Sequence, residues 1–215
     1  MQNQRSNSTF KRTSIGAALL ALVILGLGLV AKPSIERIFL TRLTAESHTT
    51  LNIAVEGLDS TLKRFEPLAK LIAERPILAD LLKDPDNQGL LPFVNEQLRL
   101  TAMTLGVSDV YLMDIGGTTI AASNYRNEIT FIGGNFSYRP YFQQALEGGL
   151  GRFFARGTTS GQRGYFFAAP VLDQTRIVGV LAVKFEVESF EASWQGSTSD
   201  IIVTDRAGVI FMSSR

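Results

Sequence analysis

Lys184 lies inside the most apolar stretch of the globular part of the chain, IVGVLAVKFEV at 177–187, a run typical of a buried strand. A cation within such a strand destabilises the fold by several kcal/mol unless an anion meets it. Strand alternation places Lys184 on one face with Ala182 and Glu186. Two interpretations follow: the ammonium binds the negative charge of a ligand, or it reaches solvent or pairs with Glu186 or Glu188.

Arg139 lies in the segment SYRPYF at 137–142, where proline is expected to turn the chain into a short helix. Its guanidinium is a planar fork of donors that suits bidentate binding of a carboxylate, and helix N–H groups add to it. The alternative is a surface arginine that stacks on Tyr138 or Tyr141.

A polar turn at 157–161 offers neutral hydrogen-bonding groups. Thr158, Thr159 and Ser160 lie between two glycines there. Their hydroxyls and the backbone N–H groups can bind carboxylate oxygens without the desolvation cost of further charge. The alternative is a hairpin loop without a ligand. Together, the arginine, the turn and the lysine predict a pocket for a small dicarboxylate, because such a ligand needs a cationic or polar group at each end.

Composition excludes several classes of function. The chain has 215 residues and a net charge of +1, so no nucleic-acid partner is expected. It has no cysteine, which excludes disulfides, thiolate metal sites and cysteine nucleophiles. The only histidine, His48, has no other catalytic candidate near it in the sequence. Asp109 and Asp114 are interpreted as residues of a hairpin turn and a strand edge. The sequence predicts a sensor with no catalytic residues, no metal and no cofactor.

The amino-terminal region carries a targeting signal. An uncharged apolar run at 15–31 follows basic residues and spans roughly 25 Å as a helix. We expect a transmembrane anchor at 15–33, with the amino terminus, 1–14, in the cytoplasm and the remainder exported, which in a bacterium means the periplasm. The alternative is a cleaved signal peptide, whose apolar region is usually about 7–15 residues.

A long helix is expected at 34–65, with a kink or an end at Pro67. Apolar residues along it have the spacing of a coiled-coil or bundle seam. The helix could pack on a domain or pair with its copy in a homodimer. The seam consists of Leu51, Val55, Leu58, Leu62 and Phe65.

Two shorter helical segments follow, at 68–83 and 92–105, and complete a helical region at 34–105. Pro76 is expected to break the first segment, and Gly106 is expected to end the second.

The signal changes to strands at 106–195. The order of two strands, a short helix and three strands predicts an α+β fold with an antiparallel sheet flanked by helices. The strands are expected at 107–115, 118–122, 152–156, 164–171 and 177–187, and the short helix at 138–146.

The last part of the chain, 196–215, repeats a pattern seen earlier. A strand, an Asp-x-x-Gly turn and a strand at 200–213 resemble the arrangement at 110–121. We expect the first hairpin of a second, similar, membrane-proximal domain that the chain truncates.

The order of anchor, long helix and sheet, with the segments at 137–142, 151–165 and 180–185, resembles the periplasmic sensor of bacterial C4-dicarboxylate transport sensor histidine kinases. The resemblance implies a double Cache (PDC-like) fold that binds succinate, fumarate or malate in its membrane-distal domain. Carried over to this sequence, the implied ligand-binding residues are Arg139, Tyr141, Thr158, Thr159, Ser160, Gly161 and Lys184.

The resemblance also implies a parent protein that is a two-component histidine kinase controlling dicarboxylate uptake. Its kinase region, with a phosphoacceptor histidine, an ATP site and a response regulator as partner, is not in this sequence, so this portion is expected to have no enzyme activity. Two alternatives stay open. One is a Cache sensor of a chemoreceptor or cyclic-dinucleotide signalling protein, and the other, more remote, is an anchored periplasmic hydrolase with Ser160 as nucleophile.

Overall fold

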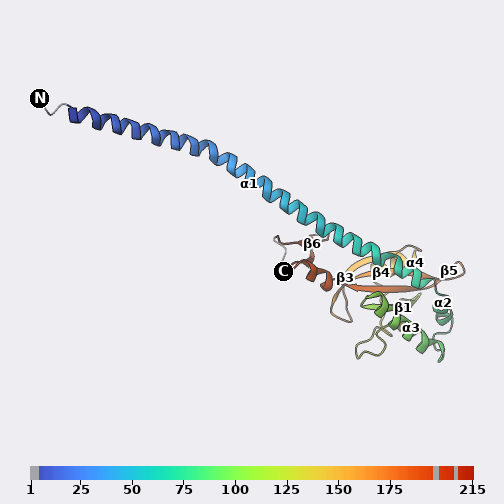
Figure 1. The fold of residues 1–215 in the computed structure, drawn as a ribbon. Coiled ribbons are helices and arrows are strands. Elements are labelled where there is room, and N and C mark those ends of the chain that lie inside the picture. The colour runs from blue at the N-terminus through green and yellow to red at the C-terminus, as the bar shows by residue number, and fades with distance from the viewer. Residues whose placement is uncertain (1–4, 196–198, 206–207) are drawn as a thin grey trace. The chain divides into compact units, whose positions relative to one another are not determined.

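A computed structural model of the chain describes residues 5–195, 199–205 and 208–215 (Figure 1). Before Phe39, it describes no side chain except that of Arg37, and the side chain of Ser189 is also outside the described set. The chain divides into two compact units, 1–53 and 54–215. The predicted limits of the Cache sheet, at 106 and 195, lie inside the second unit and stay predictions.

The first unit is helical. Helix α1 (Arg5–Ala73) begins there and ends in the second unit. Of the predicted segments 1–14 and 15–33, residues 5–33 lie on this helix, and residues 1–4 are outside the described set. The side chains of 5–33 are also outside it, so the anchor stays a prediction. Within the part of the chain that is described, no helix combines the length and the apolar character needed to cross a membrane.

Of the kink or end predicted at Pro67, the end is wrong, because α1 continues to Ala73, and the kink stays a prediction. Proline removes one helical hydrogen bond and crowds the preceding turn, at a cost of about 3 kcal/mol or more. Phe65, Ala69 and Ile72 on either side of Pro67 are buried in the core. Burial of such a helical face stabilises the structure by more than this cost.

Two short helices cover the sheet next. Helix α2 (Pro76–Lys83) begins with Pro76 in its first turn, as the predicted break requires. Helix α3 (Leu90–Leu105) begins two residues before its predicted start, because the Asn87 side chain accepts hydrogen bonds from the backbone at the start of the helix. It ends at Gly106, whose φ of 66° is the left-handed conformation that glycine adopts readily.

The five predicted strands form one antiparallel sheet in the order β2–β1–β5–β4–β3, which confirms the α+β fold (Figure 1). Helix α4 (Pro140–Leu146) connects β2 to β3, as predicted. The strands are β1 (Asp109–Asp114), β2 (Thr119–Ala122), β3 (Gly151–Arg156), β4 (Arg163–Asp173) and β5 (Arg176–Glu186).

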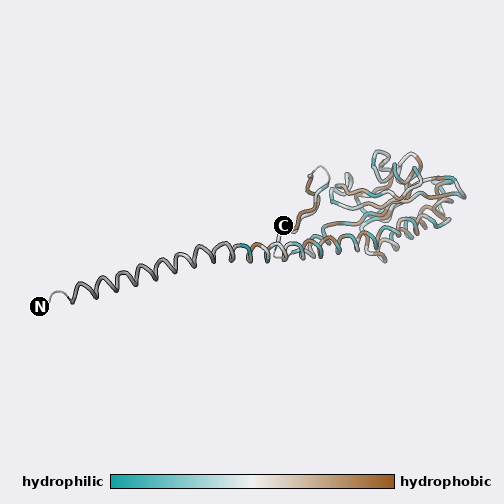
Figure 2. Tube along the Cα trace, turned by 90° about the horizontal axis from the view of Figure 1, so that it is seen from above, coloured by the Kyte–Doolittle hydropathy of each residue, from teal (hydrophilic) through white to brown (hydrophobic). Residues whose placement is uncertain are grey.

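Each face of the sheet buries an apolar layer. One face packs against the end of α1 and against α2 and α3, through strand residues such as Leu112, Leu181 and Val183. The other face carries an aromatic layer that includes Tyr111 and Phe142. Hydrophilic and hydrophobic stretches are mixed along the chain of the second unit, as Figure 2 shows. Because both faces are covered, β5 is apolar on both sides, and a charge on it has no route to solvent across the sheet.

The end of the chain forms a separate small sheet. Helix α5 (Glu188–Ser193), which the sequence did not predict, precedes strands β6 (Ile202–Thr204) and β7 (Ile210–Ser213). The two strands pair antiparallel, which confirms the predicted hairpin, although residues 206–207 of its turn lie outside the described set. Helix α5 has six residues, too few for a helical periodicity to be visible in sequence.

Candidate ligand-binding site

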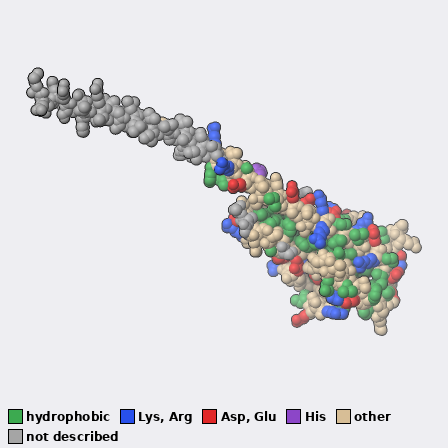
Figure 3. Space-filling model, viewed as in Figure 1, with side chains coloured by type: hydrophobic (Ala, Val, Ile, Leu, Met, Phe, Trp, Pro, Cys, Tyr) green, Lys and Arg blue, Asp and Glu red, His purple; other side chains and the backbone are tan. Residues whose placement is uncertain are grey.

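Lys184 is fully buried on β5. Its neighbours across the sheet are Asp109 on β1 and Phe166 on β4. Among the residues whose side chains are described, it is the only charged residue that is buried. Positive and negative side chains are intermixed over the face of this unit that Figure 3 shows. These surface charges need no ligand to explain them, whereas the buried charge of Lys184 does.

The Lys184 ammonium has one close partner. Its Nζ donates to the Ser160 hydroxyl at 3.0 Å. The carboxylate oxygens of Asp109 and Glu186 lie 3.9 and 3.8 Å from Nζ, longer than a charged hydrogen bond of about 2.7–2.9 Å. The alternative in which the amine reaches solvent is wrong, and Glu188 pairs with Arg163 instead. The alternative in which Lys184 pairs with Glu186 is present as an ion pair of 3.8 Å, without a hydrogen bond between the two side chains.

Asp109 differs from the edge or turn residue that the sequence indicated. Strand β1 lies inside the sheet, between β2 and β5, and Asp109 is in register with Lys184. Burial raises the pKa of the Asp109 carboxyl, while the Lys184 charge opposes the shift. Asp114 is the turn residue of the pair, since its Oδ1 accepts the backbone N–H of Thr118 at 2.9 Å.

Arg139 is the N-cap residue of α4 and is partly exposed. Its Nη2 donates to the backbone carbonyl of Arg156 at 3.2 Å and to the Thr158 hydroxyl at 3.4 Å. The guanidinium carbon lies 5.1 Å from the centre of the Tyr138 ring. The stacking expected of a surface arginine is therefore present, and it leaves the guanidinium beside the polar turn.

The turn at 157–161 joins β3 to β4. Gly161 has a φ of 69°, and its N–H donates to the Gly157 carbonyl at 2.9 Å. The Gly161 carbonyl accepts from Arg156 Nε at 2.7 Å. A Cβ at Gly157 would lie 2.7 Å from the Ser160 hydroxyl. The two glycines thus allow the tight path that turns Ser160 towards Lys184.

Two buried phenols form one wall of the site. The hydroxyls of Tyr111 and Tyr141 are 2.7 Å apart, and Tyr141 stacks on Phe166 with ring centres 5.1 Å apart. Burial raises the pKa of Tyr141 to about 12, and burial also raises the pKa of Tyr111 well above its usual range. Both phenols are neutral at physiological pH, and a neutral phenol can donate a hydrogen bond to an anion.

One cavity brings most of these groups together. The cavity has a volume of about 10 Å³, which is about the room that one water molecule needs. A neighbouring polar pocket of about 300 Å³ shares Phe131 and Thr159 with it and is lined by Ser160, Asp109 and Glu186. The cavity is lined by Tyr111, Phe131, Phe136, Arg139, Tyr141, Gly157, Thr158, Thr159, Phe166 and Lys184.

Two larger clefts lie on the helical side of the sheet. One, of about 490 Å³, lies between α1 and α3, and the other, of about 750 Å³, lies between α1 and the strands β3 and β4. Neither is lined by a buried charged side chain. The small cavity at Lys184 is therefore the better candidate, because it combines burial with an internal cation.

The structure places five of the seven predicted site residues around this cavity. Of the other two, Ser160 lines the adjoining pocket and holds Lys184, and Gly161 shapes the turn. Tyr111 and Asp109 were missed as part of the site. The only signal for them in sequence is their place on β1, and the register of β1 against β5 is needed to bring them to Lys184.

Comparisons with known proteins find related sequences and structures but no matching family model. The C4-dicarboxylate transport sensor protein DctB of Pseudomonas aeruginosa is 38% identical over 180 residues, which cover 84% of this chain and 29% of that protein. The chain thus spans less than a third of the length of this relative.

Two solved structures are also similar. The sensor domain of the V. cholerae histidine kinase DctB is 35% identical, with a TM-score of 0.79 over 81% of this chain and 68% of that one. The ligand-binding domain of the Campylobacter jejuni chemoreceptor Tlp3, in complex with 4-methylisoleucine, is 16% identical, with a TM-score of 0.53 over 79% of this chain and 71% of that one, and shares the fold alone. From the identity and coverage of the DctB sensor domain, the chain belongs to the family of DctB-like sensor domains, with a Cache-type sheet.

Proposed function

We propose that the chain binds a C4-dicarboxylate, such as succinate, fumarate or malate, in the cavity at Lys184. One carboxylate lies at Lys184 and Ser160, and the other lies at Arg139 and the Thr158 hydroxyl. The observation that carries the proposal is the burial of Lys184 with no carboxylate at hydrogen-bonding distance among the described residues.

The hydrogen-bonding capacity of Lys184 supports this assignment. An ammonium group can donate three hydrogen bonds, and within the described part of the chain Nζ donates one, to Ser160. A carboxylate of a ligand would accept those that are left at shorter range than Asp109 or Glu186. Charged hydrogen bonds of this kind contribute about 1.5–3 kcal/mol each, enough to give a small anion measurable affinity.

The size of the cavity implies that binding moves the turn at 157–161. A four-carbon diacid is several times larger than a water molecule, and the cavity has room for about one. Thr159 lies between this cavity and the adjoining pocket of about 300 Å³. A displacement of the turn that merges the two spaces would admit the ligand, with Gly157 and Gly161 as its pivots.

The whole protein that we propose is a two-component histidine kinase in the bacterial inner membrane. Its anchor at 15–33 would leave the amino terminus in the cytoplasm and the sensor in the periplasm. Its kinase region would use ATP, phosphorylate a response regulator and control dicarboxylate uptake. A homodimer through α1 fits the exposure of Leu51 and Val55, since these two residues of the predicted seam are 54% and 55% exposed.

Calorimetric titration of the 215-residue chain with succinate, fumarate and malate tests the ligand assignment. Lys184→Ala and Arg139→Ala should each weaken binding by about tenfold or more, because each removes a charged hydrogen bond. Lys63→Ala is the matched control, since this lysine forms an exposed ion pair with Asp59. If the two site variants bind as tightly as the unchanged chain, the assignment is wrong.

The same titration discriminates the other functions. The fold shared with Tlp3 supports the second candidate, a chemoreceptor sensor, whose ligand would be an amino acid. Binding of isoleucine without binding of dicarboxylates would favour that candidate. Labelling of Ser160 by a serine-directed phosphonate would favour the hydrolase alternative instead.

A further inference from the structure

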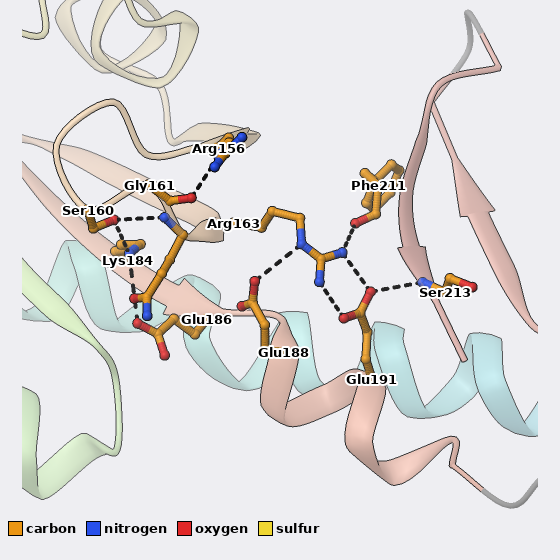
Figure 4. Close-up of polar contacts among 11 residues, drawn as sticks. Arg156, Ser160, Gly161, Arg163, Lys184, Glu186, Glu188, Glu191, Phe211 and Ser213 are labelled. Atoms are coloured by element: carbon orange, nitrogen blue, oxygen red, sulfur yellow. Dashed lines mark hydrogen bonds and ion pairs between the residues drawn. The ribbon is translucent and has the colours of Figure 1, made fainter. Parts of the chain in front are cut away.

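Arg163 is the first residue of β4, and only Gln162 separates it from the turn that carries Ser160. Its side chain points away from that turn, towards α5 and β7, whereas Ser160 points to Lys184 (Figure 4). A few residues of backbone thus separate a proposed ligand contact from a contact with the carboxyl-terminal hairpin.

The guanidinium of Arg163 is held by three groups on two elements, α5 and β7. It forms a fork with the Glu191 carboxylate on α5, with distances of 2.8 and 2.6 Å. It also donates to Glu188 at 3.2 Å and to the backbone carbonyl of Phe211 on β7 at 2.8 Å. The Glu191 carboxylate in turn accepts the backbone N–H of Ser213 at 2.8 Å. These contacts, which we call the Arg163 clamp, connect β4 to both α5 and β7.

The Arg163 clamp depends on partial burial and on the geometry of the arginine fork. The Glu191 side chain is 13% exposed, and bidentate arginine–carboxylate pairs are the geometrically most demanding ion pairs. Burial alone would raise the pKa of Glu191, but the hydrogen bonds from Arg163 and from the Ser213 backbone lower it. A lysine at position 163 could not reproduce the fork.

The turn and the clamp share one stretch of backbone. Arg163 pairs in register with Arg156, and the Gly157 N–H donates to the Gln162 carbonyl at 2.8 Å, so the stem of the turn is closed. On the other side of Arg163, a Cβ at Gly164 would lie 2.9 Å from Lys184 Cε. A displacement of the turn therefore cannot leave the backbone at Arg163 unaffected without breaking this pairing.

An apolar contact parallels the clamp. Trp194, which caps α5, is buried with Val187 and with Met212 of β7, and its ring meets that of Phe190 at 5.0 Å. It is the only tryptophan of the chain. Its emission therefore reports on the packing between α5 and the hairpin.

We propose that Arg163 is a positioning residue that couples the ligand turn to α5 and the β6–β7 hairpin, so that ligand binding changes the packing of the hairpin. The inference rests on the proposed function, because it requires a ligand that displaces the turn. A ligand changes the packing of the hairpin only if it binds more tightly to one arrangement of the turn and hairpin than to the other. The packing of the hairpin then affects the affinity for the ligand by the same factor. Loss of the clamp should therefore reduce the response of the hairpin much more than it reduces ligand affinity.

The experiment compares two readouts on the 215-residue chain. Calorimetry measures succinate affinity, and Trp194 emission measures the response of the hairpin. For the unchanged chain we expect binding together with a shift in emission. For Arg163→Gln we expect an affinity within about tenfold and the loss of most of the emission shift, while Arg163→Lys should restore part of it.

A matched control is Arg99→Gln, which removes a similar fork with Glu96 on α3, remote in sequence from the turn. Its succinate affinity and its Trp194 emission shift should both match those of the unchanged chain. If Arg163→Gln loses its native circular dichroism, Glu191→Gln is measured in its place, with the same expectation.

The outcomes separate the two proposals. Binding of succinate without a change in Trp194 emission, or a full emission shift in the clamp variant, overturns the coupling and leaves the proposed function intact. Absence of dicarboxylate binding in the unchanged chain overturns the proposed function, and the coupling with it.

Discussion

Two cations on neighbouring strands of the same sheet have opposite surroundings. Lys184 on β5 is fully buried, yet its carboxylate neighbours lie 3.8 and 3.9 Å away. The Arg163 side chain on β4 is 36% exposed, yet it is bound by two carboxylates and a backbone carbonyl. A buried cation whose carboxylate neighbours lie beyond hydrogen-bonding distance indicates a site for a ligand. A cation nearer the surface whose hydrogen bonds are taken by the protein indicates a structural connection.

The largest expected effect is a difference in stability between Lys184→Met and Arg163→Met. Lys184→Met should leave the ligand-free chain as stable as before or slightly more stable, since it removes an internal charge. Asp109 and Glu186 line a pocket of about 300 Å³ in which water can solvate them. Arg163→Met leaves the partly buried Glu191 carboxylate without its fork and should destabilise by about 1–3 kcal/mol.

Urea denaturation of both variants at pH 7 measures this difference. Succinate binding should be lost in Lys184→Met and kept in Arg163→Met. A larger loss of stability in Lys184→Met than in Arg163→Met would show that the long ion pairs of Lys184 are structural, and the contrast between the two cations would not hold.

An effect at most as large is expected from Gly164→Ala, which tests whether the position of Lys184 depends on close packing against β4. The added Cβ would lie 2.9 Å from Lys184 Cε and 3.1 Å from Cγ, so the lysine must move. Overpacking of this kind costs about 1–3 kcal/mol, and succinate affinity should fall with it. Thermal denaturation and calorimetry measure the two effects.

Gly149→Ala is the control for this substitution, because its nearest contact, the Gln144 carbonyl at 3.4 Å, is an ordinary one. If Gly164→Ala binds succinate as tightly as this control, the position of Lys184 is not critical for the ligand.

The smallest effects concern the pH dependence of stability. They have opposite signs for the carboxylate beside Lys184, which is Asp109, and the carboxylate beside Arg163, which is Glu191. The pKa of Asp109 is raised, so its carboxylate opposes folding at neutral pH, and this penalty is relieved as pH falls through its folded pKa. The pKa of Glu191 is lowered, so its contribution is present above the unfolded pKa and is lost as pH falls through its folded pKa. Asp109→Asn should therefore stabilise at pH 7 and Glu191→Gln should destabilise, each by roughly 1 kcal/mol or less.

Urea denaturation of the two variants between pH 7 and pH 3 checks these signs. The stability difference from the unchanged chain should shrink for both variants towards pH 3, from opposite sides. The same sign for both at pH 7 would contradict the different surroundings of the two carboxylates.

Local patterns in the sequence were sufficient for the strands of the main sheet and the end of α3, because turn chemistry and strand alternation depend on neighbours in the chain. They allowed the long helix to end at Pro67, and it does not, because burial of the neighbouring helical face stabilises the continued helix by more than proline destabilises it. Helix α5 was missed for a related reason, since six residues carry too little local signal and tertiary contacts decide.

The same division applies to the site. Arg139, the turn at 157–161 and Lys184 were found from side-chain chemistry, and the structure brings them to one cavity and the pocket next to it. Asp109 and Tyr111 were not found as parts of it, because their proximity to Lys184 arises from the pairing of strands far apart in the sequence. The Arg163 clamp has no signature in sequence either, since its partners lie on α5 and β7.

The sequence by itself determined that a cation would lie in a buried strand, with an arginine and a hydroxyl-rich turn as its possible companions, because residue type and periodicity are local properties. Only the tertiary structure decided which anions approach that cation, how little room the cavity has and which arginine connects the turn to the hairpin. These depend on strand register and on packing between distant segments, where a shift of one residue would exchange the faces of a strand and separate the groups.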